Sequence, residues 1–466
     1  PDSNPDSNPD SNPDSNPDSN PDSNPDSNPD SNPDSNPDSS PDSSPDSNPD
    51  SSPDSSPAPS EGDALLTEEN KSKIFLGWEK ITSKLFFHDP KDLATHTLIL
   101  GGSGSGKTVL IRRIIEEAAL LKIPSIVVDI GNDLVRLGLK SESIDPEYQE
   151  KADRYFADTD VRVYTPGLSR GRPILLTAIP DFTSSSADDN PAASIDAVVE
   201  FLANSLGLSD RAHIEKAYLK TGVTYLANNN THDLKDLIAF LESPPDEIAQ
   251  SLQYLNKAHA LASNLMALRI NNPLFSDGPT ATIDDILARD SSKTPISVFN
   301  LFGLGSLNSQ QIFVSQLTQT YFNWAKKNPK GPLQGLLIID EAKEFAPALK
   351  SSPAKGAIIR FASQARKYGL GLILATQEPK SVDSQIVNNC STQFFGRFSS
   401  PTNIQTAEGL LQMSGVLNGL GAGHFFIRSS DSKAIELKIA LGLSKHLSSA
   451  ASGSDIISLS KNANYS

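Results

Sequence analysis

The chain has 466 residues, a formal net charge of −17 and 1 cysteine. A single cysteine excludes an internal disulfide framework and suits a reducing compartment. No run of about 18 apolar residues occurs, so the sequence predicts no transmembrane helix, and we expect a cytoplasmic protein.

The negative charge is concentrated in residues 1–58, a tetrapeptide repeat of Pro-Asp-Ser-Asn that drifts to Pro-Asp-Ser-Ser. The repeat holds 14 of the 57 acidic residues and no base, so the remainder, with 43 acids against 40 bases, is nearly neutral. The repeat has almost no apolar side chains to bury, so burial cannot offset the entropy cost of ordering the chain. The proline in every unit also disfavours helix and sheet. We expect a disordered acidic spacer, with a binding tail for a basic partner as the alternative. The charge of the body argues neither for nor against nucleic acid.

Residues 59–90 form a lead-in segment with apolar anchors at 74–78 and 85–87. The main folded domain is expected to follow over residues 91–443.

Residues 101–108 fit the phosphate-binding pattern G-x-x-x-x-G-K-[ST]. They follow an apolar strand at 97–100 and precede residues 109–121, whose apolar side chains recur at helical spacing. This order aims backbone N–H groups and a helix N-terminus at phosphate. We expect Lys107 to reach the β- and γ-phosphates and the Thr108 hydroxyl to ligate Mg²⁺. The residues expected to bind ATP are Gly102, Ser103, Gly104, Ser105, Gly106, Lys107 and Thr108.

Strands and helices alternate along the chain after the phosphate loop, until a long helical stretch in the middle interrupts them. Strands are predicted at 125–129 and 162–165. Residues from about 184 to 288 then follow a helical pattern, which we interpret as a helical insertion. Its predicted helices span 195–206, 214–228 and 247–268.

A strand at 296–301 and a helix at 310–327 resume the alternation, and the apolar strand 335–339 ends in Asp340 and Glu341. Ligands bind at the carboxyl ends of such central parallel strands. Alone, the two carboxylates fit a solvated acidic turn equally well. Together with the phosphate loop they indicate a nucleoside-triphosphate hydrolase, in which Asp340 holds the Mg²⁺ shell and Glu341 orients or deprotonates the attacking water.

The last predicted elements are a helix at 357–368 and strands at 371–375, 392–398 and 424–428. Residues 444–466 are rich in serine and predicted to be a flexible C-terminal tail. Strands that alternate with helices predict an α/β fold with a doubly wound, mainly parallel sheet of about seven or eight strands.

Several of these stretches resemble the HerA-like branch of the HerA/FtsK superfamily of P-loop ATPases. Besides the phosphate loop they are residues 340–342, 364–371, 375–379, 382–383 and 388–393, with looser similarity at 128–134 and 164–167. The resemblance covers about residues 97–428. It implies a RecA-like (ASCE) ATPase that binds ATP and Mg²⁺ between the subunits of a hexameric homo-oligomer and moves DNA.

The resemblance also implies roles for two residues. Gln377 has the position of the polar sensor that contacts the attacking water or γ-phosphate, which an amide suits because it both donates and accepts. Arg366 has the position of the arginine finger that acts on a neighbouring subunit's ATP. The simpler alternatives are a polar strand-end residue and an exposed helix arginine. Arg397 is a second, weaker finger candidate.

The sequence departs from the family in two places. The arginine that typically follows the sensor glutamine is replaced here by Glu378. Residues 59–90 are too few for the β-barrel domain that some HerA proteins carry ahead of the ATPase.

Contact with DNA is not evident from the sequence. Lys343, Lys350 and Lys355 follow the Asp-Glu strand, where a loop facing a pore could present them to phosphates, but scattered surface lysines would look the same. No zinc spacing, nuclease constellation or recognition-helix pattern occurs, so no sequence preference is predicted.

The leading hypothesis is therefore a ring-shaped, ATP-hydrolysing DNA translocase or helicase. One alternative is a DNA-coupling or packaging ATPase of the same superfamily. A second is a nucleotide-gated scaffold that recruits a nuclease or another effector protein. The absence of a Leu-Ser-Gly-Gly-Gln signature disfavours an ABC-type ATPase, and the paired carboxylates disfavour a kinase.

Overall fold

The structure is a computed structural model that describes residues 67, 70–180, 182, 191–250, 255–276, 278–288, 292–429 and 433–461. The predicted spacer at 1–58 lies outside these residues, as does the stretch 183–190 at the start of the predicted insertion. None of the described helices is long and apolar enough to cross a membrane.

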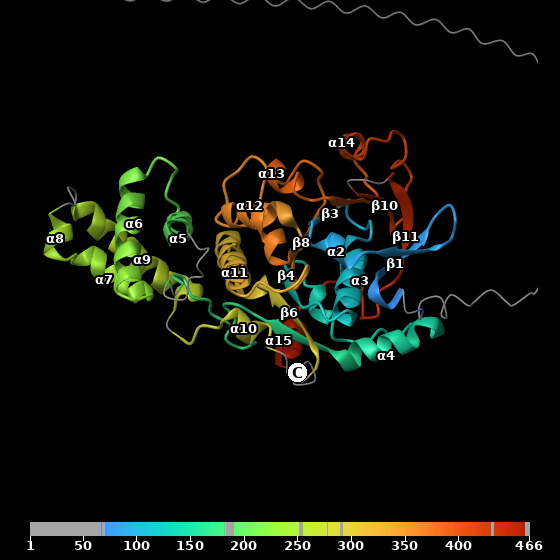
Figure 1. Cartoon of the computed structure of the whole chain (residues 1–466), viewed down its shortest axis with the longest axis horizontal. Helices are drawn as coiled ribbons and strands as arrows, with labels where there is room; N and C mark the ends of the chain where they lie inside the picture. Colours follow the sequence, from blue (N-terminus) through green and yellow to red (C-terminus); the bar gives the residue numbers. More distant parts are fainter. Residues whose placement is uncertain are drawn as a thin grey trace, which may run out of the picture. The chain divides into compact units, whose positions relative to one another are not determined.

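The described strands form one sheet of 11 strands, in the order β2-β1-β11-β10-β9-β3-β8-β7-β4-β6-β5 (Figure 1). Neighbours from β9 to β5 are parallel, whereas β9, β10, β11, β1 and β2 pair antiparallel. The prediction of a doubly wound, mainly parallel sheet is confirmed, although the sheet has more strands than expected. The strands are β1 (Ile74–Glu79), β2 (Leu85–His88), β3 (Thr97–Leu100), β4 (Ser125–Asp129), β5 (Thr159–Tyr164), β6 (Thr294–Asn300), β7 (Gly335–Ile339), β8 (Leu370–Thr376), β9 (Thr392–Phe395), β10 (His424–Arg428) and β11 (Ile435–Ile439).

The predicted lead-in is part of this sheet. Its apolar anchors form β1 and β2, and β1 pairs with β11, with Gly77 opposite Ile439. Ile74 and Phe75 are fully buried because they pack on helix α3 (Lys107–Leu120). Residues 59–90 are therefore not a segment separate from the ATPase core where the structure describes them.

Helices cover both faces of the sheet. Along β3, Leu98 and Leu100 belong to one hydrophobic cluster and Ile99 to the other, because successive side chains of a strand point to opposite faces. Helices α3, α4 and α15 pack on the Ile99 face, and α11 and α12 on the opposite face. The helices are α2 (Pro90–Leu93), α3, α4 (Gln149–Asp158), α5 (Pro191–Ser205), α6 (His213–Asn228), α7 (Leu234–Glu242), α8 (Asp246–Ala249), α9 (Leu255–Asn271), α10 (Ile283–Ile286), α11 (Leu307–Lys327), α12 (Lys355–Gln364), α13 (Ser384–Val387), α14 (Pro401–Leu411) and α15 (Gly453–Lys461).

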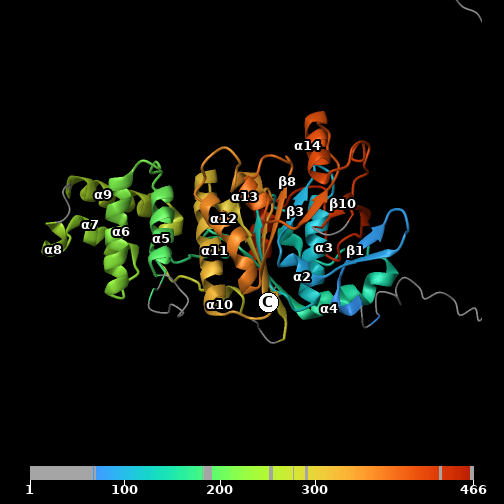
Figure 2. The same ribbon diagram turned by 45° about the horizontal axis from the view of Figure 1, so that its top comes forward.

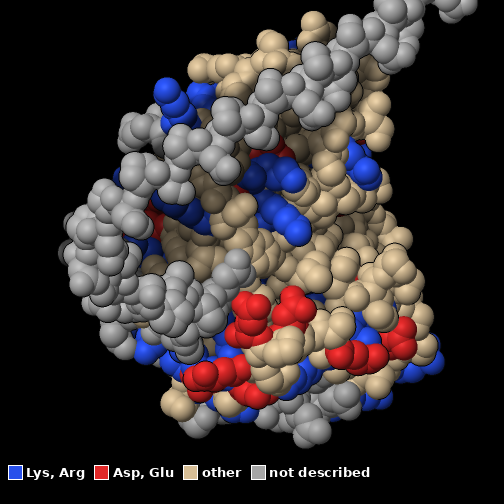
Figure 3. All heavy atoms as spheres, turned by 90° about the vertical axis from the view of Figure 1, so that its right-hand side faces the viewer, with Lys and Arg blue, Asp and Glu red and all other residues tan. Residues whose placement is uncertain are grey.

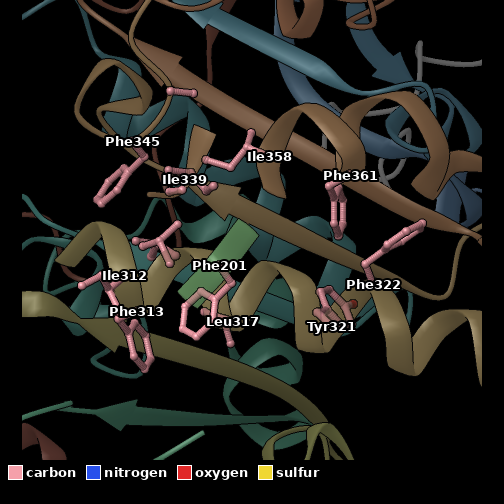
Figure 4. Close-up of a cluster of buried hydrophobic side chains, with 14 of the residues drawn as sticks. Phe201, Ile312, Phe313, Leu317, Tyr321, Phe322, Ile339, Phe345, Ile358 and Phe361 are labelled. Atoms are coloured by element: carbon pink, nitrogen blue, oxygen red, sulfur yellow. The ribbon is translucent and has the colours of Figure 1, made fainter. Parts of the chain in front are cut away.

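A cluster of aromatic side chains joins α11 and α12 to the sheet (Figure 4). The Phe361 ring of α12 lies 6.2 Å from the Tyr321 ring and 6.1 Å from the Phe322 ring of α11. Ile339, the last residue of β7, is buried in the same cluster. Close packing at Ile339 fixes the point at which the chain leaves the sheet, immediately before Asp340 and Glu341.

The described part of the predicted insertion is helical, as expected. Helix α5 contacts both α11 and α6, so it joins the core to the block formed by α6, α7 and α9 (Figure 2). Gly222 lets α6 approach α7 closely, since a Cβ there would lie 2.5 Å from a Leu237 methyl group.

The prediction of a flexible tail over residues 444–466 is wrong as far as residue 461. Ser444 is buried, and α15 packs on β5 through the buried side chains of Ile456 and Leu459. The abundance of serine concealed this short amphipathic helix, which tertiary packing stabilises. Residues 462–466 lie outside the described residues.

Candidate functional site

The predicted phosphate loop joins β3 to the N-terminus of α3 in a tightly held turn. Gly104 and Gly106 have φ angles of +68° and +100°, a region that glycine adopts without steric cost. A Cβ at Gly106 would also lie 3.0 Å from the backbone nitrogen of Gly423. The loop is therefore preformed, with its backbone amides beside the first turn of a 14-residue helix.

Lys107 is buried within this loop. Its Nζ donates hydrogen bonds to the carbonyl oxygens of Gly101 at 2.8 Å and Gly102 at 3.2 Å. Burial lowers the pKa of the amine, while the carboxylates of Glu341 and Asp340 act in the opposite direction. The amine thus lies between the loop and the acidic strand end, where an anionic group would offset the cost of its burial.

The carboxylates of Asp340 and Glu341 follow β7, which is separated from β3 by β8. Asp340 is 8% exposed, and burial together with the negative charges of Glu341 and Asp129 raises its pKa to about 7. Glu341 has a left-handed backbone with φ of +53°, and its N–H donates to Asp340 Oδ1 at 3.0 Å. A positive φ in a residue other than glycine is strained and is often found at functional sites.

The structure brings Gln377 and Glu341 together. Gln377 directly follows β8, and its Nε2 donates a hydrogen bond to Glu341 Oε1 at 2.5 Å. The second carboxylate oxygen, Oε2, is buried and has no hydrogen-bond partner among the described residues. This oxygen can accept a proton or a hydrogen bond from a molecule bound beside the loop.

Asp129, which the sequence analysis left without a role, is a further carboxylate of the site. It ends β4, is fully buried, and burial raises its pKa to about 6. Its Oδ2 accepts hydrogen bonds from Asn300 Nδ2 at 3.2 Å and Val135 N at 3.3 Å, while Oδ1 has no such partner in the described part of the chain. The signal available in the sequence was an aspartate at the end of a buried strand, as for Asp340.

Asp129 and Asp340 each have a carboxylate oxygen close to Gly131. A Cβ placed on Gly131 would lie 3.6 Å from Asp340 Oδ2 and 3.9 Å from Asp129 Oδ1. No group of three or more His, Cys, Asp or Glu side chains in the described ranges forms a complete metal cage. Mg²⁺ usually takes one or two carboxylates and completes its shell with phosphate oxygens and water. The carboxylate of Asp340 fits that pattern, and Thr108, the other expected ligand, is the second residue of α3.

The two candidate arginine fingers occupy different ends of the sheet. Arg366 is exposed in the 3-10 turn Ala365–Tyr368, just before β8, whereas Gln377 follows that strand. A strand of this length spans about 20 Å, so Arg366 lies far from the phosphate loop of its own chain. Arg397 lies beside that loop, since its Nη2 donates to the carbonyl oxygen of Gly104 at 3.3 Å.

Two of the three lysines considered for DNA contact are paired with acids. Lys343 Nζ lies 3.2 Å from Glu378 Oε1, and Lys355 Nζ lies 2.9 Å from Asp383 Oδ2. Lys350 is exposed. The acid that replaces the family's arginine at position 378 thus neutralises a lysine two residues after Glu341.

A cavity of about 910 Å³ adjoins the phosphate loop, and its lining does not include the carboxylates of Asp129, Asp340 or Glu341. Its lining includes Gly104, Gly106, Lys107 and Thr108 of the loop and residues of the segments 143–148 and 438–448, together with Trp78, Val109, Ala422 and Gly423. Figure 3 shows lysine and arginine side chains in the upper half of the face on the right-hand side of Figure 1, above a group of aspartate and glutamate side chains. The cavity walls lie far apart in sequence, so the sequence analysis did not find them.

Comparisons with known proteins agree with this arrangement. The sequence model described as "Helicase HerA, central domain" matches residues 80–321, more than half of the chain. A model described as "Zonular occludens toxin (Zot)" matches residues 307–397.

Two curated relatives match short stretches. A probable helicase of Methanocaldococcus jannaschii is 34% identical over 67 residues, which are 14% of this chain and 13% of that protein. Protein P9 of Pseudoalteromonas phage PM2 is 37% identical over 65 residues, 14% of this chain and 28% of that protein. The matched stretches thus cover less than a third of either relative.

Solved structures share the fold at low sequence identity. VirB4 of Thermoanaerobacter pseudethanolicus has a TM-score of 0.55 and 15% identity, covering 79% of this chain and 96% of that one. The bacterial conjugative coupling protein TrwB has a TM-score of 0.51 and 13% identity, covering 81% of this chain and 91% of that one. Taken with the family match, this fold shows that the chain belongs to the HerA-like branch of the HerA/FtsK superfamily of P-loop ATPases.

Proposed function

We propose that this protein hydrolyses ATP and uses the reaction to move DNA, as a ring-shaped homo-oligomer with ATP bound at the interfaces between subunits. The observation that carries the proposal is the Glu341–Gln377 contact at the ends of two adjacent parallel strands, beside the loop that holds Lys107. A general base, a polar sensor and a phosphate-binding lysine in one place suit attack of water on a γ-phosphate.

Each residue has a role in this proposal. Lys107 leaves the carbonyl oxygens of Gly101 and Gly102 and neutralises the β- and γ-phosphates. Thr108 and Asp340 hold Mg²⁺, which supplies charge neutralisation at the phosphates. Glu341 accepts the proton of the attacking water through its unpartnered oxygen, and Gln377 orients that water.

Arg366 completes the site of a neighbouring subunit. Its exposure and its position at the far end of β8 prevent it from reaching the phosphates of its own chain. In a head-to-tail ring the same residue of one copy faces the site of the next. Arg397 supports the phosphate loop of its own chain and is not the finger.

The DNA-coupling or packaging ATPase is the second candidate. It is supported by the fold likeness to TrwB, described as a conjugative coupling protein, over most of both chains. The third candidate is a nucleotide-gated scaffold that recruits an effector partner, such as a nuclease. This candidate would be favoured if DNA did not change the rate of ATP hydrolysis in the test below.

The test is ATP hydrolysis by the full chain with and without linear duplex DNA. We expect DNA to stimulate hydrolysis, and Glu341→Gln to lower it by about 100-fold or more while ATP still binds, because a positioned general base contributes roughly that factor. Glu344→Gln, three residues along the chain, is the matched control and should hydrolyse normally. Equal rates with and without DNA would overturn the motor and leave the scaffold.

A further inference from the structure

The residue before β3, His96, is a buried histidine that has no role in the site described above. It is 1% exposed, and its backbone is left-handed with φ of +65°, which is uncommon for residues other than glycine. Its carbonyl oxygen accepts the N–H of Thr392, the first residue of β9, at 3.3 Å. Its ring Nδ1 accepts the N–H of Leu372 in β8 at 3.0 Å. Because β3 pairs with both strands, this one residue fastens all three near their amino ends.

The hydrogen bond from Leu372 fixes the protonation of the ring. A ring nitrogen that accepts a hydrogen bond carries no proton, so the proton of the neutral ring lies on Nε2. Burial lowers the pKa of His96 to about 4, the backbone of Ala362 in α12 opposes this fall, and the positive charge of Arg366 adds to it. The ring is therefore neutral at neutral pH, and it lies close to Arg366 without repelling the guanidinium.

The 3-10 turn that carries Arg366, Ala365–Tyr368, is here called the finger turn. Its last carbonyl oxygen accepts a hydrogen bond from Gln334 Nε2 at 2.6 Å, which ties the end of the turn that leads into β8. The other end continues α12, where the Phe361 ring has its centroid 6.4 Å from that of the His96 ring. His96 thus fills the space between the backbone of β8 and the last turn of α12, from which the finger turn begins.

We propose that His96 is a positioning residue, which holds the finger turn so that Arg366 reaches the nucleotide of the neighbouring subunit. The proposal rests on the proposed function, in which Arg366 acts across an interface. His96 itself touches neither nucleotide nor Mg²⁺. A neutral, flat side chain bonded to β8 suits this place, because an imidazolium would repel the guanidinium and a shorter side chain would leave α12 unsupported.

Strand β3 then serves two sites at its two ends. Its carboxyl end leads into the phosphate loop of its own chain, and its amino end supports the arginine used by the next chain. The four residues of β3 span about 13 Å, so His96 lies well away from the phosphate loop. An effect of His96 on catalysis is therefore expected at the neighbour's nucleotide rather than at its own.

The test measures ATP hydrolysis by full-length His96→Asn with duplex DNA present. Asparagine tolerates a left-handed backbone and has an amide oxygen that can accept the Leu372 N–H, but it lacks the ring that packs on Phe361. We expect kcat to fall by about tenfold or more, while KM for ATP stays within about twofold. A displaced arginine that acts only in the transition state lowers the rate and not the binding of the substrate. An unchanged kcat would overturn the proposal.

Mixing two variants separates the finger turn from the phosphate loop. His96→Asn subunits keep an intact nucleotide site, and Glu341→Gln subunits keep both His96 and Arg366. An equal mixture should regain about a quarter of the wild-type rate, the fraction of interfaces that combine the two intact halves. If His96 supported only the phosphate loop of its own chain, every site in the mixture would be defective, and the absence of rescue would overturn the proposal.

Arg366→Ala mixed with Glu341→Gln is the reference for this measurement. Rescue of that mixture without rescue of the His96→Asn mixture would overturn the role of His96 and leave the proposed function intact. Failure of both mixtures, with subunits shown to exchange, would overturn the arginine that acts across the interface, and the role of His96 with it.

His88→Asn is the matched control. The His88 ring is also buried, at the end of β2, and the charges that act on it are those of Asp92 and Asp89 rather than Arg366. This variant should hydrolyse ATP like the wild type. If circular dichroism showed that His96→Asn does not fold, His96→Gln would take its place in both measurements, since glutamine keeps most of the length of the ring. Unfolding of both variants would overturn the proposal, because His96 would then maintain the fold itself.

Discussion

At the scale of single residues, the site gathers acidic groups that destabilise the fold. Asp340 and Asp129 are buried close to Gly131 and have pKa values raised to about 7 and about 6. Each carboxylate loses water and repels the other. A cation held there, as proposed above, would relieve both costs, and the empty protein would be the less stable for its affinity toward a charged ligand.

We predict that Asp340→Asn stabilises the protein free of metal and nucleotide while abolishing hydrolysis. The pKa of Asp340 is higher in the folded protein than the ordinary value of 3.8, so the folded state binds the additional proton and stability falls as pH rises from about 4 to about 7. Asparagine carries no such charge. The melting temperature of the variant should exceed that of wild type by a few degrees at pH 8.

The pH dependence supplies the check on this prediction. The difference in melting temperature should shrink as pH falls and vanish below about pH 4, where the carboxyl is protonated in both states. Asp210→Asn, in an exposed loop, should behave as wild type at every pH. If the Asp340→Asn variant were less stable than wild type at pH 8, the ionised Asp340 carboxylate would not destabilise the folded protein.

At the scale of elements, the C-terminal helix α15 belongs to the core. Ile456 is fully buried in the cluster that also contains residues of α3 and α4. We predict that Ile456→Ala lowers the free energy of unfolding by about 2–5 kcal/mol, the usual cost of a buried isoleucine cut to alanine. Denaturant unfolding would measure it.

Ser458→Ala is the matched control in the same helix, because its side chain is exposed. It should leave the unfolding free energy within about 0.5 kcal/mol of wild type. If the two variants unfolded alike, α15 would not be a packed element, and the expectation of a flexible tail from residue 444 would apply after all.

Local pattern was sufficient to predict some elements and not others. The β3–loop–α3 unit and β7 were predicted because the sequence pattern of each lies within one short continuous stretch of the chain. The proximity of Glu341 and Gln377, which are 36 residues apart in the sequence, could also be predicted. Both residues follow parallel strands, and the carboxyl ends of such strands lie at the same edge of a sheet. The contacts of Glu116 with Ser444 and of Asp129 with Asn300 span 328 and 171 residues, and no local pattern encodes them.

Helix α3 illustrates why spacing alone misleads. Arg112 and Glu116 have the i,i+4 spacing of a surface ion pair. Both are fully buried, and each binds elsewhere: Arg112 to Asp133 and Glu116 to the backbone of residues 443–444. The pattern indicated the helix correctly, but tertiary packing determined the partners.

At the scale of the whole molecule, the residues proposed for catalysis lie at two separate places in the chain. Glu341, Gln377 and Lys107 lie at the carboxyl ends of the parallel strands, whereas Arg366 precedes β8 at their amino ends. A catalytic site complete within one chain would need Arg366 at the same end of the parallel strands as Glu341, Gln377 and Lys107. The separation suits the proposed ring, in which each copy would contribute Arg366 to its neighbour across a heterologous interface.

This geometry predicts complementation between two inactive variants. Arg366→Ala leaves Glu341 intact, and Glu341→Gln leaves Arg366 intact, so each alone should be inactive. When the two are mixed, an interface formed by the first variant's nucleotide site and the second variant's arginine is complete. Random assembly at equal concentrations should place that combination at about a quarter of the interfaces, and ATP hydrolysis should return to about that fraction of the wild-type rate.

Lys367→Ala is the control for the arginine, because it removes a neighbouring exposed cation from the same turn. Lys367→Ala alone should remain active, and mixing Arg366→Ala with further Arg366→Ala subunits should restore nothing. Absence of rescue at every mixing ratio, with oligomers shown to exchange subunits, would mean that Arg366 does not act across an interface. The exposed arginine would then belong to the surface of a protein whose sites are complete within each chain.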